Sequence, residues 1–494
     1  MTATELDLTL VIDIGKSNVR MFLLDAAGTV VERHSRSNAS VASALGYPAL
    51  DVHGLQNWMQ SSLRASLHAR RCARAICVTH GAAFVALGDD GLAWEPLDYE
   101  FAAVNAHSAN DADFQAARID FHNTLSPELP VGLNAARQLH WMQTEHPALW
   151  SRTQTLVPYP QYWAWLLSGV ACSEVSSLGC HTHLWNPETG EFSRLAQGKG
   201  WARLFPPLRS AWEVLGTVGA ARSADWGLPA ACRVHVGAHD SNACLVRYLD
   251  TEARTGSENP ALTLVSSGTW TVLMAPGAPV GTLLAEKDML GNVDVTGRVT
   301  ATARFMGGRE FAAIAQGADP KAASIDALGS LVDKRIFALP SFAEQGGPFV
   351  GRTGALQQHG RHLSLQEHCQ LSSAERATLA ALYCAQLCAW LVHYLWADSG
   401  TLQSRIVIEG PLAQNPVFIQ VLQTLAPAST CLASADALEG TARGAWLLTR
   451  WGRPDPGHTV QPDSCPVEGL GAYHAAWLAQ IASSGAAMPY VGQP

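Results

Sequence analysis

A carboxylate ends a β-rich run in the middle of the chain, in the sequence Val234-His235-Val236-Gly237-Ala238-His239-Asp240. An apolar stretch follows, so we expect Asp240 at the junction of a strand and a helix. A carboxylate in this position can accept a proton from a bound hydroxyl group. It can equally cap the N-terminus of its own helix, and the spacing alone does not separate these two roles.

A second candidate follows the first apolar run of the chain. The turn after this run has the parts of a phosphate site, namely Gly15, Lys16, Ser17 and Asn18. The glycine lets the backbone approach an anion, the serine and asparagine offer hydrogen-bond donors, and the lysine adds charge. Asp13, just before the turn, is placed to hold a hydrated Mg²⁺ near phosphate groups. An ordinary β-turn with a polar tip is the alternative.

A similar turn occurs near the middle of the chain, at Ser266-Ser267-Gly268-Thr269. The run before it, Leu262 to Val265, repeats the tetrapeptide Leu8-Thr9-Leu10-Val11. We therefore expect two domains built on one plan, each opening with strand, turn and strand. Two opposed phosphate-binding turns would suit phosphoryl transfer, which depends mainly on positioning and charge stabilisation.

Strands and helices alternate along the chain, which predicts an α/β fold. An antiparallel meander is expected at Leu8 to Ile14, Val19 to Asp25 and Val30-Val31. Apolar residues at three- and four-residue spacing predict four helices, at Leu55 to Ala69, Asn134 to Glu145, Tyr159 to Leu167 and Ala374 to Ala397. The length of 494 residues predicts at least two domains, and we place the boundary at 243/244.

Composition narrows the class of partner. Hydrophobic residues make up 48% of the chain and the formal net charge is -9, which argues against a nucleic-acid or anionic-membrane surface. The segment Met1 to Asp7 lacks a basic region, and no apolar run approaches the roughly 18 residues that span a bilayer. The 11 cysteines include no Cys-x-x-Cys pair, so we expect reduced core residues. We therefore expect a cytoplasmic protein with a small-molecule ligand.

These motifs together resemble the FGGY carbohydrate kinases, and most closely the L-fuculose and L-rhamnulose kinase branch. The resemblance rests on six segments in the family's order: Asp13 to Arg20, Asn38 to Ser40, Leu139 to Met142, Gly237 to Asp240, Ser266 to Met274 and Glu439 to Ala445. It extends over nearly the whole chain.

The resemblance implies two actin-like (ribonuclease H-like, ASKHA) domains with a central cleft between them. Residues 1–243 would bind the sugar and contact phosphate, and residues 244–494 would bind ATP together with Mg²⁺. Asp240 would be the general base, and Asp13 and Asp240 would face the metal. The ATP contacts carried over from the family are Asp13, Gly15, Lys16, Ser17, Asn18, Ser267, Gly268, Thr269, Gly410 and Asn415.

The sequence departs from the family pattern around both ligands. The nucleotide loop keeps Gly410 and Asn415, but has Glu409 and Pro411 where glycines are usual. On the sugar side, an acidic contact is missing, and Gln138 stands in place of a lysine. The sugar contacts that we expect instead are His80, Gly81, Asp98, Tyr99 and His239.

The sequence thus predicts an ATP-dependent carbohydrate kinase that phosphorylates a hydroxyl of a small ketose, either L-fuculose- or L-rhamnulose-like or a pentulose. Xylulose, ribulose, erythrulose and polyols stay open as acceptors. Two other classes also stay open: a sugar- or nucleotide-binding sensor with weak catalysis, and a metal-dependent hydrolase using His239 and Asp240. We expect no nucleic-acid or membrane partner. A homodimer is a possible oligomeric state.

Overall fold

A computed structural model describes residues 6–117, 120–249, 261–399, 404–435, 440–453, 459–462 and 467–483. The chain divides into two compact units. Unit 1 comprises Met1–Ser257, Gly291–Val299 and Glu439–Asp455, and unit 2 comprises the rest. Glu439 of the last family segment lies outside the described residues.

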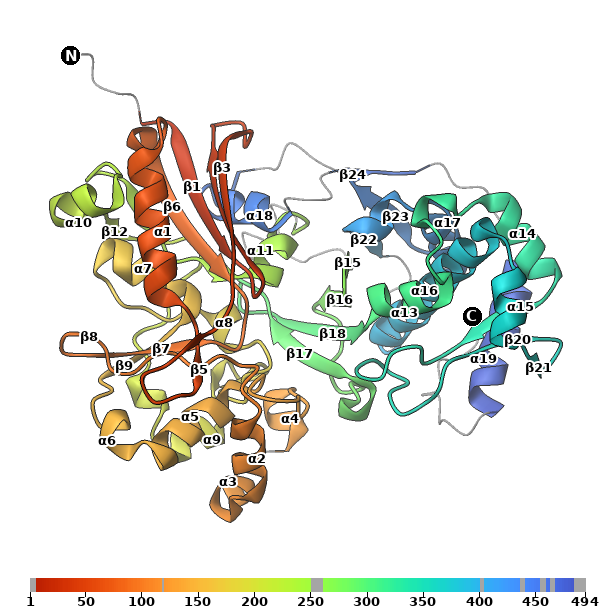
Figure 1. Cartoon of the computed structure of the whole chain (residues 1–494), viewed down its shortest axis with the longest axis horizontal. Helices are drawn as coiled ribbons and strands as arrows, with labels where there is room; N and C mark the ends of the chain where they lie inside the picture. The colour runs from red at the N-terminus through yellow and green to blue at the C-terminus, as the bar shows by residue number, and fades with distance from the viewer. Residues whose placement is uncertain are drawn as a thin grey trace. The chain divides into compact units, whose positions relative to one another are not determined.

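Unit 1 is built on a seven-stranded sheet (Figure 1). Its order is β12 (Val214–Thr217), β13 (Arg233–His235), β6 (Cys72–Thr79), β1 (Leu8–Ile14), β2 (Asn18–Leu24) and β3 (Val30–Ser37), with β14 (Ala238–His239) also paired to β6. The strands β1, β2 and β3 form the predicted antiparallel meander, and β1, β6 and β13 run parallel.

Both faces of this sheet are covered. Alternate residues of β1, from Leu8 to Ile14, pack in one core with α1 (Val52–Ala65), α7 (Tyr159–Ser168) and α10 (Gly219–Trp226). The intervening residues point to the other face, where α18 (Gly440–Leu448) contacts β1 and β6, and α11 (Asp240–Val246) contacts α18. Asp13 therefore emerges on the face where α11 begins.

A second layer of unit 1 surrounds a small sheet of β8 (Gly91–Leu92), β7 (Phe84–Gly88) and β9 (Thr155–Pro158). Its helices are α2 (Ala103–Asn110), α3 (Ala112–Ala117), α4 (Phe121–Thr124), α5 (Ala135–Glu145), α6 (Pro147–Trp150), α8 (Val175–Leu178) and α9 (Arg194–Gly198). An aromatic-rich core that includes Trp94, Trp185 and Trp201 holds this layer together.

Unit 2 repeats the path of the unit 1 sheet. The order of this second sheet is β17 (Met289–Val293), β18 (Val299–Phe305), β16 (Thr271–Pro276), β15 (Leu262–Ser267), β22 (Arg405–Glu409), β23 (Thr430–Ser434) and β24 (Thr459–Val460). Most of its edge strand β17, from Gly291 on, is counted with unit 1. The strands β18, β16 and β15 are antiparallel neighbours, and β15, β22 and β23 run parallel. The tetrapeptide repeat lies in the equivalent strands β1 and β15, so the expectation of one plan used twice is confirmed.

The long helix α16 (Ser373–Trp396) is the core helix of unit 2 and contacts α13 (Gly307–Ala315), α14 (Ile325–Asp333) and α17 (Pro416–Leu425). A capping box between Ser372 and Glu375 begins it. By length and hydropathy α16 could span a membrane, but 94% of its most apolar window is buried. The expectation that no apolar run reaches such a length was wrong. Because α16 is buried on nearly every side, apolar residues occupy almost all of its positions.

The other predicted helices are present as α1, α5 and α7, with ends shifted by at most four residues. All described cysteines are free, and all but Cys369 are buried, as expected for reduced core residues. The predicted boundary at 243/244 falls within α11, whereas the compact units part after Ser257. Unit 1 regains residues 439–455 because α18 packs on β1 and β6.

Candidate active site

Asp240 is the first residue of α11 and directly follows β14. The position that caps the helix is His239, whose side chain makes no capping bond. Asp240 Oδ1 accepts the Ser241 backbone N–H at 2.6 Å and lies 3.3 Å from the Ser241 hydroxyl. Oδ2 has no hydrogen-bond partner among the residues that the structure describes, and 28% of the side chain is exposed. One oxygen is thus held in place and the other can meet a ligand.

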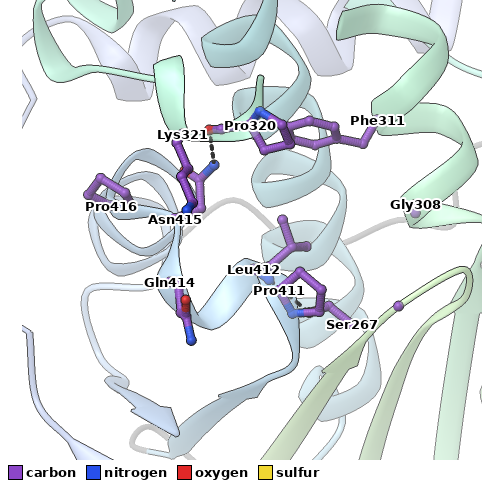
Figure 2. A pocket seen from close by; sticks show the side chains of 12 residues that line it. Ser267, Gly308, Phe311, Pro320, Lys321, Pro411, Leu412, Gln414, Asn415 and Pro416 are labelled. Atoms are coloured by element: carbon purple, nitrogen blue, oxygen red, sulfur yellow. Dashed lines mark hydrogen bonds between the residues drawn. The ribbon is translucent and has the colours of Figure 1, made fainter. Parts of the chain in front are cut away.

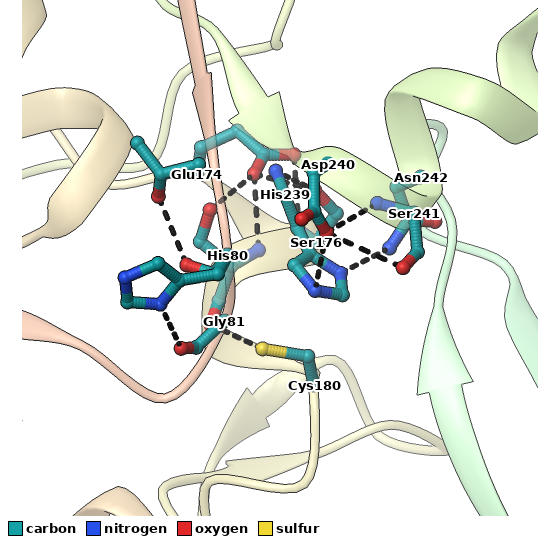
Figure 3. A network of polar contacts seen from close by, with 11 residues as sticks. His80, Gly81, Glu174, Ser176, Cys180, His239, Asp240, Ser241 and Asn242 are labelled. Carbon is teal, nitrogen blue, oxygen red and sulfur yellow. Dashed lines mark hydrogen bonds and ion pairs between the residues drawn. The ribbon is translucent and has the colours of Figure 1, made fainter. Parts of the chain in front are cut away.

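The imidazole ring of His239 faces the carboxyl group of Asp240 (Figure 3). Its Nε2 lies 3.2 Å from Asp240 Oδ1, and the Asn242 side-chain amide lies 3.3 Å from Nδ1. Burial lowers the pKa of His239 to about 4, so the ring is neutral at pH 7. If the Asn242 amide donates to Nδ1, the ring proton resides on Nε2 and points at Asp240.

Gly81 is required by close packing against the same ring. A Cβ at this position would lie 3.0 Å from His239 Nε2 and 2.8 Å from Cys180 Sγ. Behind His239 lies the fully buried Glu174, which accepts hydrogen bonds from the backbone and hydroxyl groups of Ser176 and Ser177. The Ser176 hydroxyl in turn accepts the His239 backbone N–H at 3.3 Å. Burial raises the pKa of Glu174 to about 7. This buried acid had no signal in the sequence.

His80 follows β6 and lies in the same network. Its Nδ1 is 3.0 Å from the Gly81 carbonyl, so Nδ1 donates and Nε2 carries the lone pair. Nε2 is buried and has no partner, while the ring packs against Tyr99 and Tyr159. Burial lowers the pKa of His80, and the charge of Asp240 opposes this effect. An unpaired buried acceptor of this kind suits a sugar hydroxyl.

Lys16 and Asp98, which lie 82 residues apart in the sequence, form an ion pair that Ser40 also joins through a hydrogen bond to Asp98. Lys16 Nζ also lies 3.3 Å from a Glu100 carboxylate oxygen and 5.0 Å from the centre of the Tyr99 ring. Burial favours a raised pKa at Asp98, but the hydrogen bonds from Lys16 and Ser40 outweigh it and lower the pKa. The lysine charge is therefore committed to the predicted sugar contacts Asp98 and Tyr99.

The remainder of this turn is open. Gly15 N–H donates to the Asn18 carbonyl at 3.0 Å, and the Asn38 side chain donates to the Gly15 carbonyl at 2.9 Å. Ser17 and Asn18 are exposed. Their side chains remain available to a ligand.

Asp13, at the end of β1, carries an unusual charge state. Burial and then the negative charge of Asp240 raise its pKa to about 7, and Arg20 only partly offsets them. Two carboxyls that disfavour each other's ionisation are the oxygen donors that a hard divalent cation prefers. The donor set of Asp13 and Asp240 therefore fits Mg²⁺.

Unit 2 contains a separate pocket of about 390 Å³ (Figure 2). Its lining brings together the predicted residues Ser267, Gly268 and Asn415 with their loop neighbours Pro411, Leu412, Gln414 and Pro416. It also includes residues that the sequence did not single out: Gly307, Gly308, Phe311, Pro320 and Lys321. Apolar rings and prolines dominate the walls. A flat aromatic ligand would suit them, with the glycines leaving backbone exposed at one end.

Glycines let the loops of this pocket approach each other. Gly410 has φ +79°, and a Cβ there would lie 2.0 Å from the Ser267 carbonyl oxygen. A Cβ at Gly308 would lie 2.4 Å from the Gly268 carbonyl, and the Gly308 N–H donates to the exposed Thr269. The turn that contains Gly268 and Thr269 is therefore packed directly on α13.

The departure at residues 409–411 has a local explanation. Pro411 is the first residue of the 3₁₀ helix η5 (Pro411–Gln414), where an N–H has no helical partner in any case. Glu409 is buried in β22, and its carbonyl accepts the Ser267 hydroxyl. Asn415 caps α17 through the Phe418 N–H at 3.0 Å. The other departure, Gln138, bridges the carbonyls of Ala82 and Gly132 at 2.7 Å each.

Comparison with known proteins identifies the family to which the chain belongs. The FGGY family of carbohydrate kinases, N-terminal domain, matches residues 122–246, and the carbohydrate kinase FGGY, C-terminal domain, matches residues 259–457. The crystal structure of a carbohydrate kinase from Novosphingobium aromaticivorans is 32% identical, with 98% of this chain and 100% of that chain covered and a TM-score of 0.84. The chain belongs to the FGGY family of carbohydrate kinases.

Two further matches have lower sequence identity. L-fuculokinase from Salmonella typhi is 27% identical over 295 residues, which cover 56% of this chain and 58% of that protein. The match thus spans less than two thirds of its length. Xylulose kinase from Rhodospirillum rubrum, at 17% identity, has the same fold, with a TM-score of 0.72 and coverage of 97% and 98%. The prediction of an α/β fold with two actin-like FGGY domains is confirmed.

Proposed function

We propose that this FGGY protein is an ATP-dependent carbohydrate kinase that transfers the γ-phosphate of MgATP to a hydroxyl of a small ketose. The single observation that carries the proposal is Asp240, whose Oδ1 is fixed by Ser241 and faces His239 while Oδ2 has no partner in the described part of the chain. Burial raises the pKa of Asp240, which makes the carboxylate a stronger base than an exposed aspartate.

In this proposal the acceptor hydroxyl donates its proton to Asp240 Oδ2 as its oxygen attacks the γ-phosphorus. The bond between the γ-phosphorus and the bridging oxygen to the β-phosphate breaks, and ADP leaves with that oxygen. Neutral His239 stays hydrogen-bonded to Oδ1 and keeps the carboxylate oriented. His80 Nε2 accepts a second hydroxyl of the sugar, and the side chain of Asp98, held by Lys16, binds a third. These assignments extend the sequence predictions for His80, Gly81, Asp98, Tyr99 and His239.

We further propose that unit 2 binds the nucleotide, with adenine in the apolar pocket beside Phe311 and Pro411 and the phosphates toward Ser267, Gly268 and Thr269. Ser17 and Asn18 would donate hydrogen bonds to phosphate from unit 1. Asp13 and Asp240 would hold Mg²⁺, which when bound neutralises negative charge on the phosphates. Turnover requires ATP and the sugar to bind at the same time. A measurement of kinase activity therefore tests this part of the proposal.

The acceptor is proposed by class. The matches include L-fuculokinases and xylulose kinases, so 6-deoxyketohexoses and pentuloses come first, followed by tetruloses and polyols. The experiment is a screen of purified protein with MgATP against these four classes, reading ADP release and confirming the sugar phosphate by ³¹P NMR. ADP release with one class supports the kinase. Stabilisation by a sugar without any ADP release would instead support the sensor alternative.

The negative net charge and the buried α16 support a cytoplasmic enzyme without a nucleic-acid or membrane partner. The proposal includes a homodimer, which sedimentation of the purified protein would test.

A further inference from the structure

A cluster of metal-ligating side chains lies in the second layer of unit 1, on elements that contribute nothing to the network around Asp240. It consists of His107 on α2, Asp111 at the C-terminal end of α2, and His140 on α5. The helices α2, α3 and α5 lie against one another in this layer (Figure 1). The ligand atoms of the three residues all lie within 4.8 Å of one another.

The spacing follows from helical geometry. His107 and Asp111 are four residues apart and so project from one side of α2, while α5 brings His140 to the same place from another part of the chain. His140 Nε2 lies 3.2 Å from Asp111 Oδ2. Two ligands of a tetrahedral zinc ion, each about 2.0–2.1 Å from the metal, lie about 3.3 Å apart. The Asp111 and His140 pair therefore already has the separation of two zinc ligands.

His140 supplies a second, independent observation. Its side chain is 1% exposed, it stacks on Phe114 at 4.5 Å between ring centres, and neither ring nitrogen has a hydrogen bond of normal geometry. A fully buried imidazole without a satisfied nitrogen is costly. A bound ion would satisfy Nε2, the nitrogen that faces Asp111.

The surroundings orient the other two ligands. Asp111 Oδ1 accepts the Phe114 N–H at 2.7 Å, which leaves Oδ2 toward His140. His107 Nδ1 lies 3.2 Å from a Glu145 oxygen, and Nε2 lies 2.8 Å from the Thr144 hydroxyl. A metal ion would replace one of these His107 contacts, and the other would keep the ring in place, as outer contacts do in metal sites.

We propose that His107, Asp111 and His140 form a structural site for a divalent transition metal of the zinc class, with water in the fourth position. Two imidazoles and one carboxylate favour Zn²⁺ or Co²⁺ over Mg²⁺, which prefers oxygen ligands. The ion ties α2, the start of α3 and α5 together. It is therefore separate from the Mg²⁺ proposed beside Asp13.

The test uses full-length protein without a histidine tag, stripped with chelator, loaded with Zn²⁺ or Co²⁺ and desalted. We expect one retained zinc per chain by mass spectrometry, a visible Co²⁺ spectrum typical of a tetrahedral site, and no competition by excess Mg²⁺. His107→Gln and Asp111→Asn should each weaken Zn²⁺ affinity by at least about tenfold, because each removes a ligand. His122→Gln, which changes an exposed histidine of the same unit, should leave affinity unchanged.

Far-UV circular dichroism at 25 °C establishes that each variant is folded before loading. Wild-type protein that retains no zinc, or ligand variants that retain it as the wild type does, would overturn the site. Neither result depends on kinase activity, so the outcome is independent of the proposed function.

Discussion

Asp13 is the residue whose charge state should respond most clearly to pH. Its pKa is about 7 in the folded protein against an ordinary value of 3.8, so between these values the folded state holds a proton that the unfolded chain releases. The stability contributed by Asp13 is thus complete below about pH 4 and is lost as pH rises through about 7.

Asp13→Asn should therefore stabilise the metal-free protein at pH 8 relative to wild type, by on the order of a few kcal/mol, and have little effect at pH 4. Urea denaturation at both pH values measures the difference. Adding Mg²⁺ at pH 8 should narrow it, since the cation stabilises only the wild type. A difference that does not depend on pH would contradict the assigned charge state.

His80 is expected to act in sugar binding. His80→Ala removes the unpaired Nε2 and should raise KM for the sugar about tenfold, with a smaller change in kcat and none in KM for ATP. The control His122→Ala changes an exposed histidine of the same unit. Equal effects on the two Michaelis constants would indicate a general loss of structure instead.

At the residue scale, the sequence named residues that the structure brings together, but it did not predict their contacts. The motif that ends at Asp240 and the position of His80 were found from the chain alone. The Lys16 and Asp98 ion pair was not, because 82 residues separate the two and Lys16 was expected to face phosphate. Glu174 was missed because a single buried acid has no periodicity or motif.

At the scale of elements, Gly410 tests how the unit 2 pocket is closed. Gly410→Ala places a Cβ 2.0 Å from the Ser267 carbonyl and should destabilise the protein by about 1–3 kcal/mol and weaken ATP binding. Gly360→Ala is the matched control, since Gly360 has a similar φ of +77° and open space around it. It should leave ATP affinity unchanged. Similar losses of ATP affinity in both variants would contradict the role of this contact.

The sequence predicted strands and helices from periodicity, and the repeated tetrapeptide revealed the duplicated strand order. It could not predict the pocket walls, because Phe311, Pro320 and Lys321 come from segments that carry no nucleotide motif. The sequence analysis also overlooked that α16 is long and apolar enough to span a membrane. Only its packing against α13, α14 and α17 shows it to be a core helix.

At the scale of the whole molecule, the sugar and the adenine end of ATP should protect different segments of the chain. With a non-hydrolysable ATP analogue, hydrogen exchange should slow at 267–269, 307–311 and 411–416 of unit 2, because these segments line the pocket. With sugar alone, it should slow at 80–82, 98–100 and 239–242 of unit 1. Protection of the same segments by both ligands would contradict the division of roles.

The most direct measurement of the central claim is turnover by Asp240→Asn with the best sugar of the screen. The variant keeps the size and the Oδ1 acceptor but loses the base, so kcat should fall by about 10²–10⁴. Calorimetry should show sugar binding unchanged. A variant that forms sugar phosphate at nearly the wild-type rate would contradict the account, because proton transfer would then not require Asp240.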